Sequence, residues 1–417
     1  MGNPTTDIAV VGGGAAGFFA AIAARRANAA ARVTLFERAA KVLAKVEVTG
    51  GGRCNLTNSF AGITDLSQAY PRGHKLMKRL FKTFDHEDTC RWFEENGVPL
   101  VTQPDECVFP RAQDAHAVMD CLTRQAARLG VTVCCHSCLT DMQPMPDGCL
   151  ELHFQNGMRR VFHRAIVTTG GSPQARGLYY LECMGHRVES PVPSLFTFNI
   201  CDRSFRDLMG TVVDPVEVSI PGTKLRARGA LLVTHWGASG PAILKLSSYA
   251  ARWLAEHDYR APLAVCWTAR LARQEVEETL AGIVAANPRK QLGSLRPFGL
   301  PSRLWLYLIG KMGLEPTKPW GETGRKTLNR MLETLVNDQY TIAGKGSYRD
   351  EFVTCGGVSL KSIDPNTLQS RVCPGLFFAG EVLDVDAITG GFNLQAAWTT
   401  GYVAGQMAAG PTRRHAP

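Results

Sequence analysis

Three glycines near the N-terminus have the spacing that allows a backbone to wrap around a pyrophosphate. Gly12, Gly14 and Gly17 stand between a short apolar run, residues 8–11, and an alanine-rich stretch, residues 18–27. This order of expected strand, glycines and expected helix is the context that a dinucleotide-binding loop requires. Gly12 permits the tight turn, Gly14 admits the phosphates, Gly17 allows close packing, and the free N–H groups of the helix start attract the phosphates. The predicted dinucleotide-binding residues here are Gly12, Gly14, Ala15, Ala16 and Gly17.

A carboxylate ends the second expected strand, residues 31–37. Glu37 stands twenty residues after Gly17. At this distance an acidic side chain of a dinucleotide-binding unit hydrogen-bonds the hydroxyl groups of a ribose. Arg38 follows it directly, and we count Glu37 and Arg38 among the cofactor-binding candidates.

The composition predicts a globular protein of more than one domain. The 417 residues are 45% hydrophobic and 20% charged, and a single hydrophobic core stops growing well below that length. No apolar stretch is long enough to span a bilayer, and the N-terminus lacks the basic region of a signal peptide. We therefore expect a cytoplasmic protein without a membrane partner.

The thirteen cysteines do not predict a metal site or a disulfide framework. Their number is odd and their spacing is irregular, and the single cluster is Cys134, Cys135 and Cys138. That segment alternates as a strand would, and no second pair of cysteines lies nearby to complete a zinc site. We expect buried or half-buried thiols and no metal.

Positive charge is concentrated in two stretches of a chain whose net charge is +9. Residues 287–330 hold nine basic residues against Glu315 and Glu322, a net of +7. A shorter basic run comprises Arg72, Lys75, Lys78, Arg79 and Lys82. The last four of these have the spacing of one helical face. Concentrated positive charge suits a polyanionic partner, and the alternative is an ordinary solvated basic surface.

The order of expected elements predicts an α/β fold with insertions. Residues 1–195 alternate strands and helices, as in a doubly wound, Rossmann-like domain. Residues 211–220 and 230–234 alternate as sheet and predict a small β-barrel or sandwich, and residues 274–287, 302–313 and 327–336 have helical periodicity. Strand character returns at 352–359 and 376–379, before a last helix at 392–407. We expect the first part of a cofactor domain at 1–195, an inserted β-barrel-like unit at 196–265, a small basic helical unit at 266–345, and the second part of the cofactor domain at 346–417.

Four segments in this order resemble the BaiN/RdsA-type (YhiN-like) family of NAD(P)- and FAD-dependent oxidoreductases. They are GGGAAG (12–17), TGGGRCNLTN (49–58), LLVTHWGASGPA (231–242), and residues 355–405 with CGGV and GEVLDVD. The chain departs from the family pattern at two places, which is typical of a divergent branch. Leu43-Ala44-Lys45 stands where the family usually has Gly-Arg-Lys, and the stretch after Gly170-Gly171 is shorter.

The resemblance implies a GR2-type FAD-binding domain and a set of residues around the flavin. The GGGRCN loop would approach the ribityl chain or ring, Glu381 would accept hydrogen bonds from ribityl hydroxyls, and the helix that starts near Gly391 would face the N1/O2 edge of the flavin. The implied cofactor-binding residues are Lys45, Thr49, Gly50, Gly51, Arg53, Asn55, Gly170, Gly380, Glu381, Gly391, Phe392 and Asn393.

The resemblance also implies the reduction of a carbon–carbon double bond conjugated to a carbonyl. Family substrates include steroid-type enones and a uridine of ribosomal RNA, which becomes dihydrouridine. Cys54 and His235 are the candidate proton donors, and the alternatives are a buried packing thiol and a structural histidine. No second nucleotide-binding fingerprint is present, so NAD(P)H would dock only transiently.

Three functions therefore remain open from the sequence. The first is reduction of a uridine in ribosomal RNA, the second is reduction or oxidation of a small enone or amine, and the third is a non-catalytic, flavin-carrying RNA-binding protein. For the first, the RNA-binding candidates are Arg289, Lys290, Arg303, Lys311, Arg325, Lys326 and Arg330.

Overall fold

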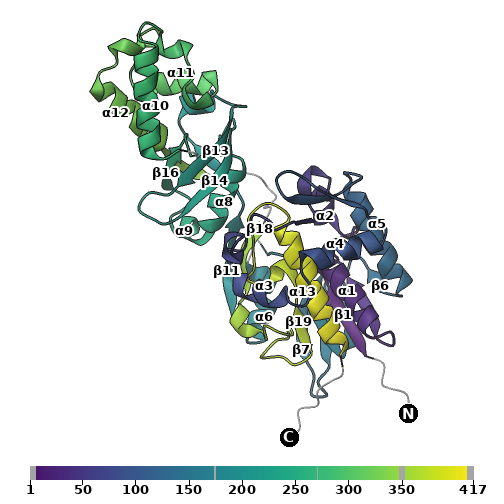
Figure 1. The fold of residues 1–417 in the computed structure, drawn as a ribbon. Helices are drawn as coiled ribbons and strands as arrows, with labels where there is room; N and C mark the ends of the chain where they lie inside the picture. The colour runs from purple at the N-terminus through teal and green to yellow at the C-terminus, as the bar shows by residue number, and fades with distance from the viewer. Residues whose placement is uncertain (1–5, 173–174, 270, 347–352, 411–417) are drawn as a thin grey trace. The chain divides into compact units, whose positions relative to one another are not determined.

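A computed structural model describes residues 6–172, 175–269, 271–346 and 353–410 of the chain. The chain divides into two compact units. The sheet unit comprises Met1–Pro193 and Val353–Pro417, and the barrel unit comprises Ser194–Phe352. Both ends of the chain thus belong to one unit, into which the other is inserted (Figure 1).

The sheet unit is built on a five-stranded parallel sheet with strand order β19-β10-β1-β2-β6. The strands are β1 (Asp7–Val11), β2 (Arg32–Phe36), β6 (Thr132–Cys134), β10 (Arg164–Val167) and β19 (Leu376–Phe378). Continuous runs of buried apolar residues, such as residues 8–11 in β1, are typical of parallel sheets because helices cover both faces. Residues 150–154 lie in the stretch that was expected to form the doubly wound domain. They instead form β8 in a separate sheet, and the fifth parallel strand is β19 from the C-terminal part of the chain.

Three smaller sheets complete the sheet unit. One is the antiparallel sheet β3 (Thr57–Asn58), β5 (Cys107–Pro110) and β4 (Leu100–Thr102). The second is the antiparallel sheet β7 (Leu139–Pro144), β8 (Leu150–Phe154) and β9 (Arg159–Phe162). The third is the pair β11 (Val188–Ser194) and β18 (Val353–Val358). The predicted strand at 352–359 matches β18 at residues 353–358. Phe352 lies outside the described residues, and Ser359 follows the strand.

The helices α1 (Ala15–Ala27) and α13 (Phe392–Ala409) join the two ends of the chain by close packing. Both are rich in alanine and glycine, and a Cβ atom added to Gly401 would lie 2.6 Å from the Ala16 carbonyl oxygen. A Cβ on Gly405 would overlap the Ala20 carbonyl oxygen. Small residues therefore bring α13 directly against the helix that follows the glycine loop. The other helices of this unit are α2 (Ala44–Val48), α3 (His74–Leu80), α4 (His86–Glu95), α5 (Ala115–Arg128) and α6 (Tyr179–Cys183).

The barrel unit contains a closed six-stranded barrel with strand order β12-β15-β14-β13-β16-β17. The strands are β12 (Phe198–Ile200), β13 (Val212–Ser219), β14 (Arg226–Val233), β15 (Gly237–Ser239), β16 (Ala261–Cys266) and β17 (Asp338–Lys345). The barrel-side helices are α7 (Arg203–Arg206), α8 (Pro241–Tyr249) and α9 (Ala251–Glu256). The helical layer between β16 and β17 is α10 (Arg273–Ala286), α11 (Ser302–Lys311) and α12 (Arg325–Val336).

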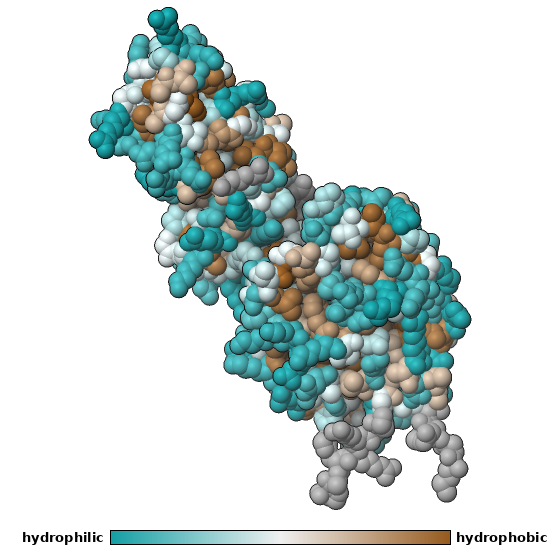
Figure 2. Space-filling model, in the orientation of Figure 1, coloured by the Kyte–Doolittle hydropathy of each residue, from teal (hydrophilic) through white to brown (hydrophobic). Residues whose placement is uncertain are grey.

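The inserted β unit and the basic helical unit share one hydrophobic core. Barrel residues such as Phe198 and Ile342 belong to the same buried cluster as Trp305 and Met331 of the helical layer. The last barrel strand, β17, follows the helices in sequence, so the helical layer is an insertion between the neighbouring barrel strands β16 and β17. On the face in Figure 2, hydrophilic residues dominate the surface of both units, and hydrophobic residues form smaller patches.

Candidate dinucleotide site

The glycine loop combines two tight contacts with one open position. A Cβ on Gly12 would overlap the Thr168 carbonyl oxygen, and a Cβ on Gly17 would overlap the Gly12 carbonyl oxygen. A Cβ on Gly14 would meet nothing within 4 Å. Gly14 is also the N-cap of α1 and supplies no side-chain cap, so the first N–H groups of the helix are available to an anion. This cradle fits a pyrophosphate, as the spacing predicts.

The Glu37 carboxylate lies directly against the glycine loop. One oxygen accepts from the Gly13 N–H at 2.8 Å and the other accepts from the Ala39 N–H at 2.8 Å. The backbone of the CCHSC segment runs beside it, because the Glu37 N–H donates to the Cys134 carbonyl at 2.9 Å. The carboxylate is thus oriented by backbone donors at the edge where a ribose would follow the phosphates, and Arg38 next to it is exposed.

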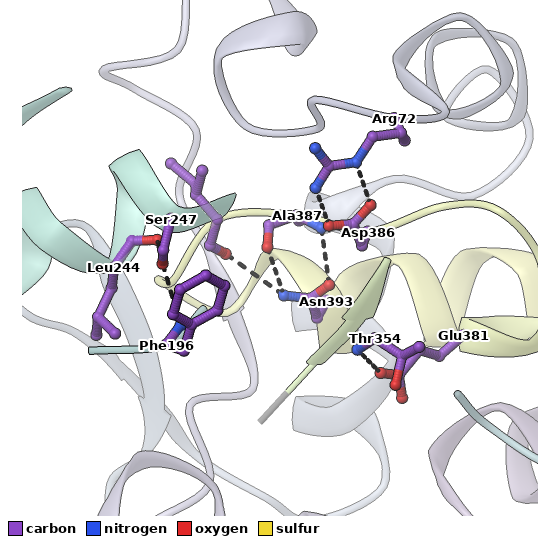
Figure 3. A network of polar contacts seen from close by, with 10 residues as sticks. Arg72, Phe196, Leu244, Ser247, Thr354, Glu381, Asp386, Ala387 and Asn393 are labelled. Atoms are coloured by element: carbon purple, nitrogen blue, oxygen red, sulfur yellow. Dashed lines mark hydrogen bonds and ion pairs between the residues drawn. The ribbon is translucent and has the colours of Figure 1, made fainter. Parts of the chain in front are cut away.

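Three distant stretches of chain meet at Glu381. One oxygen of its side chain lies 3.2 Å from the Lys45 Nζ atom. The second oxygen accepts from the Thr354 N–H at 2.8 Å (Figure 3). A Cβ on Gly170 would lie 3.8 Å from the Glu381 carboxylate and 4.0 Å from the Lys45 Nζ atom. The structure therefore brings together three cofactor candidates from the sequence, Lys45, Gly170 and Glu381. Thr354 belongs to this cluster too, and the sequence reasoning missed it because a backbone N–H carries no motif.

Gly380 connects this cluster to the glycine loop. Its φ is +76°, and an added Cβ would lie 2.8 Å from the Ala16 Cβ atom. Its N–H donates to the Thr400 hydroxyl at 2.8 Å. The chain before Glu381 is therefore held between α1 and α13, beside the start of α1.

The departure at residue 43 has a structural consequence. Leu43 is the N-cap of α2 and adopts φ +59°, in the left-handed region that favours glycine. The glycine usual in the resembling family would take this conformation without strain. In this chain the Leu43 side chain is buried instead, and Lys45 still reaches Glu381.

The GGGRCN loop is an almost continuous left-handed turn. Gly50, Gly51, Gly52 and Cys54 have φ values of +59°, +70°, +87° and +61°. The Arg53 guanidinium holds this turn together, because it donates to the Gly50 carbonyl at 3.0 Å and lies 4.4 Å from the centre of the Phe109 ring. Thr49 closes the other side, since its hydroxyl donates to the Val46 carbonyl at 2.8 Å. A Cβ on Gly51 would meet nothing within 4 Å, so this part of the loop faces open space.

Asn55 and Asn393 fix the start of α13. With its amide oriented to satisfy both ends, Asn55 donates to the Thr57 carbonyl at 3.1 Å and accepts from the Gly391 N–H at 3.3 Å. The Asn393 amide exchanges two hydrogen bonds with the backbone of Ala387, at 2.9 and 3.0 Å (Figure 3). Gly391, the N-cap of α13, has φ +88° and no side-chain cap. The structure thus brings Asn55, Gly391 and Asn393 together at a helix N-terminus.

The segment before α3, which was expected only as the start of a basic run, supports the same helix start. The Tyr70 hydroxyl donates to the Phe392 carbonyl at 2.9 Å, and both residues are buried. The Arg72 guanidinium forms a two-point ion pair with the Asp386 carboxylate, with Nε 2.5 Å from one oxygen (Figure 3). Arg72 had been counted in a basic run, and only a three-dimensional contact could have shown that its charge is neutralised.

The two candidate proton donors lie in different units. The Cys54 thiol is fully buried, and this burial raises the pKa of Cys54 to about 12, so the thiol keeps its proton at neutral pH. His235 lies on the turn between β14 and β15 of the barrel unit, exposed, with its ring 4.0 Å from the ring of Trp236. Within the barrel unit, the Phe196 N–H donates to the Ser247 hydroxyl at 3.0 Å (Figure 3). This hydrogen bond joins the chain before β12 to α8.

All seven basic candidates are exposed, and three of them bind a backbone carbonyl or a carboxylate of the barrel unit. Arg303 donates to the Met209 carbonyl at 3.2 Å, Lys311 lies 2.5 Å from the buried Asp338 carboxylate, and Arg330 donates to the Met312 carbonyl at 2.7 Å. The remaining four are exposed and form no ion pair with the described residues: Arg289, Lys290, Arg325 and Lys326.

These four residues lie on two adjacent segments. The Gly321 N–H donates to the Pro288 carbonyl at 2.8 Å, and the Trp320 N–H donates to the Lys290 carbonyl at 2.9 Å. The segment with Arg289 and Lys290 therefore lies beside the one that leads into α12, which begins with Arg325 and Lys326. Glu322, between the two, is an exposed acid.

The described residues contain no group of three or more His, Cys, Asp or Glu side chains arranged to hold a metal ion. Within the same residues, no helix combines the length and the apolar character needed to cross a membrane.

The parallel sheet, the open glycine loop, the uncapped α1 and the oriented Glu37 define a Rossmann-type dinucleotide-binding protein. The chain belongs to the HI0933-like family, whose Rossmann-domain model matches residues 6–407. The resemblance drawn from the four motifs is thereby confirmed, as is the prediction of a Rossmann-like α/β fold with a barrel.

Curated relatives align with almost the whole chain. A 3-dehydro-bile acid delta(4,6)-reductase from Clostridium scindens is 26% identical over 410 residues, which cover 96% of this chain and 98% of the relative. A ribosomal RNA dihydrouridine synthase from Escherichia coli is 27% identical over 415 residues, covering 96% and 97%. A protein of the same name from Haemophilus influenzae is 27% identical over 403 residues, covering 94% and 96%. The chain is therefore related to enzymes of reductive chemistry.

Proposed function

We propose that this protein is an FAD-dependent oxidoreductase that reduces a carbon–carbon double bond conjugated to a carbonyl, in a uridine of ribosomal RNA. The observation that carries the proposal is the meeting of Lys45, Gly170 and Glu381 beside the glycine loop, since these come from three separate stretches of the chain. This cluster lies next to the glycine loop, because Gly380 packs against Ala16 at the start of α1. A dinucleotide bound at the loop would extend from its phosphates toward its reactive ring here.

The residues present fit FAD. The open Gly14 and the α1 N-terminus would bind the pyrophosphate, and Glu37 would bind the ribose. Glu381 and Lys45 would contact the ribityl hydroxyls, while the α13 N-terminus near Gly391 would face the ring edge that becomes anionic on reduction. When bound and reduced by two electrons from a donor, the flavin would supply the hydride.

In this reduction the β carbon of the substrate receives a hydride and the α carbon receives a proton. The C5=C6 bond of uracil is conjugated to C4=O in the same way as the double bond of an enone, so one site chemistry serves both. The two electrons would come from NAD(P)H, docked transiently, because the sequence has no second dinucleotide fingerprint. Cys54 and His235 remain the proposed proton donors.

Two observations favour a ribosomal RNA substrate. Two of the three relatives described above are named as ribosomal RNA dihydrouridine synthases. The four exposed cations of the barrel unit (Arg289, Lys290, Arg325 and Lys326) would meet phosphates, while the base is extruded into the site. A small enone is the second candidate, favoured by the bile acid reductase, which matches over an equal share of the chain.

The test is the dihydrouridine content of ribosomal RNA from a strain that lacks this gene, measured by mass spectrometry. We expect one dihydrouridine to disappear and to return with the wild-type gene, while a Gly14→Val variant that fails to bind flavin does not restore it. An unchanged profile, together with turnover of a steroid-type enone by the purified protein and NAD(P)H, would transfer the proposal to the second candidate.

A further inference from the structure

Helix α3 of the sheet unit has a one-sided basic face. Leu76, Met77 and Leu80 of this helix are buried, and Lys75, Lys78 and Arg79 are exposed. The helix ends at Leu80, so Lys82 does not continue the helical face that the spacing predicts; it lies exposed in the turn that follows. We call Lys75, Lys78, Arg79 and Lys82 the α3 face.

The cations of the α3 face are hardly neutralised by the protein. Within the described residues, Lys75, Lys78 and Lys82 form no ion pair, and Arg79 donates to the neutral Asn366 amide at 2.7 Å. The sequence from Leu66 to Phe84 contains no acidic residue. The charge of this surface acts on the Asp65 carboxylate, whose pKa is lowered chiefly by hydrogen bonds from Ser67 and to a lesser extent by the charges of His74 and Lys78.

The α3 face is attached directly to the loop that precedes α13. Arg72, two residues before the helix, is paired with Asp386, and a Cβ on Gly73 would lie 2.6 Å from a Val385 methyl group. Helix α3 also packs on α13, beside which it lies in Figure 1. The basic face and the Gly391 start of α13 therefore belong to the same rigid part of the sheet unit.

We propose that the α3 face binds the phosphate backbone of an RNA strand whose uridine enters the site at the start of α13. The inference rests on the proposed function and extends it, because it adds a contact surface on the sheet unit itself. A small enone carries no row of negative charges for the α3 face to bind. Successive phosphates of a single RNA strand, in contrast, present repeated negative charges to its flexible lysines. Contacts in this unit fix the strand near the site independently of the cations of the barrel unit.

The test compares full-length protein variants that differ only in exposed charge. The first variant is Lys75→Gln/Lys78→Gln/Lys82→Gln. The second, Lys75→Arg/Lys78→Arg/Lys82→Arg, keeps the charge. The third, Arg128→Gln/Arg159→Gln/Lys361→Gln, removes three exposed cations of the same unit outside α3. Binding of a fluorescein-labelled stem–loop RNA with uridines in its loop is measured from 50 to 300 mM salt.

We expect the first variant to bind the RNA at least tenfold more weakly at low salt, with a slope of log K against log salt reduced by about 2, since each phosphate contact contributes roughly 0.7 to 0.9. The second and third variants should keep the wild-type slope. Flavin absorbance and the rate of flavin reduction by NAD(P)H should be unchanged in all three. An equal slope for the first and third variants would overturn the inference.

Failure of the proposed function has a different signature. If wild-type protein does not reduce uridine in ribosomal RNA from the deletion strain, the proposed substrate is wrong, whatever the binding slopes are. If the wild type does reduce it and the first variant matches the wild type in kcat/KM and in salt slope, only the role of the α3 face is wrong.

Discussion

The guanidinium of Arg72 and the carboxylate of Asp386, 314 positions apart in the chain, form a two-point ion pair in which Asp386 is fully buried. The pair joins the segment before α3 to the loop before α13. Together with the Tyr70–Phe392 hydrogen bond and the Asn393–Ala387 pair, it fixes the backbone that presents the α13 N-terminus. The Arg72–Asp386 ion pair therefore stabilises the conformation of the loop before α13 as well as the packing of the core around it.

The Asp386→Ala variant should be strongly destabilised. It leaves the Arg72 guanidinium without its carboxylate in a largely buried position, and breaking such a pair costs about 3 to 5 kcal/mol. The Arg72→Met/Asp386→Leu double variant removes both charges and should recover most of this free energy of unfolding, measured by urea denaturation of the apoprotein. If the pair also positions the α13 start, the double variant should still bind FAD more weakly and show a shifted flavin reduction potential. A recovered stability with wild-type potential would limit the pair to a role in folding.

The glycine loop offers a matched pair of substitutions. Gly14→Ala places a Cβ in open space at φ −90°, so the free energy of unfolding of the apoprotein should change by less than about 1 kcal/mol. FAD affinity should fall at least tenfold, because the methyl group lies where the pyrophosphate approaches the backbone. Gly17→Ala should instead destabilise the fold by 2 kcal/mol or more, roughly the cost of an overpacked core, since its Cβ overlaps the Gly12 carbonyl oxygen. Flavin fluorescence titration and urea unfolding separate the two effects.

The sequence predicted the parts of this site that depend on local backbone geometry. The positions of Gly12, Gly14, Gly17 and Glu37 follow from a strand–turn–helix unit, and the structure has the loop, α1 and the carboxylate as expected. What it could not predict are contacts between distant segments. Arg72 looked like part of a solvated basic run until its partner 314 positions away was known.

The same limit applies to the barrel unit. Arg303, Lys311 and Arg330 are indistinguishable in sequence from the cations around them that form no ion pair. Only the packing of α11 and α12 shows that these three bind backbone carbonyls or Asp338. A small β-barrel or sandwich was expected from residues 211–220 and 230–234, but the closing strand, β17, was not, because it lies beyond three helices in the chain. Pairing between strands so far apart leaves no local signal.

This division of the basic residues predicts two kinds of variant. Arg325→Gln/Lys326→Gln should leave stability unchanged and reduce the salt slope of RNA binding by roughly 1.4 to 1.8, as expected for two phosphate contacts. Arg330→Gln should lower the free energy of unfolding by about 1 to 2 kcal/mol, because the Met312 carbonyl loses a charged donor, and should change the slope little. Fluorescence anisotropy and thermal unfolding measure both. A reduced stability of the Arg325→Gln/Lys326→Gln variant would contradict the assignment of these residues to a free surface.

A buried histidine should make the stability of the protein sensitive to acid. His186 contacts the Leu181 carbonyl at 3.0 Å and the Ser370 hydroxyl at 2.8 Å, with its ring beside Phe378. Burial lowers the pKa of His186 in the folded protein, so below about pH 6.5 the unfolded chain takes up a proton that the folded chain does not. The contribution of His186 to the free energy of unfolding should therefore be fully present above this pH. It should be lost as the pH decreases toward the pKa of His186 in the folded protein. The His186→Gln variant should be less stable at pH 7.5 and show a smaller decrease between pH 7.5 and 5.5 in urea denaturation; an identical decrease would refute the assignment.

The proton donor can be identified from the pH dependence of the oxidative half-reaction, in which the reduced flavin is reoxidised and the substrate takes up the hydride and the proton. A rate that depends on a histidine proton falls as the pH rises through the neutral range, whereas one that depends on the Cys54 thiol stays level there, because burial raises the pKa of Cys54 to about 12. Since the thiol is fully buried in a loop with φ +61° at Cys54 itself, we expect Cys54→Ser to lower stability and FAD retention while the rate per bound flavin stays within fivefold of the wild type. Stopped-flow measurement of the rate of substrate reduction by the pre-reduced His235→Gln variant then tests His235 as the proton donor. A level pH profile with a rate loss above a hundredfold in Cys54→Ala, at full flavin content, would assign the proton to the thiol instead.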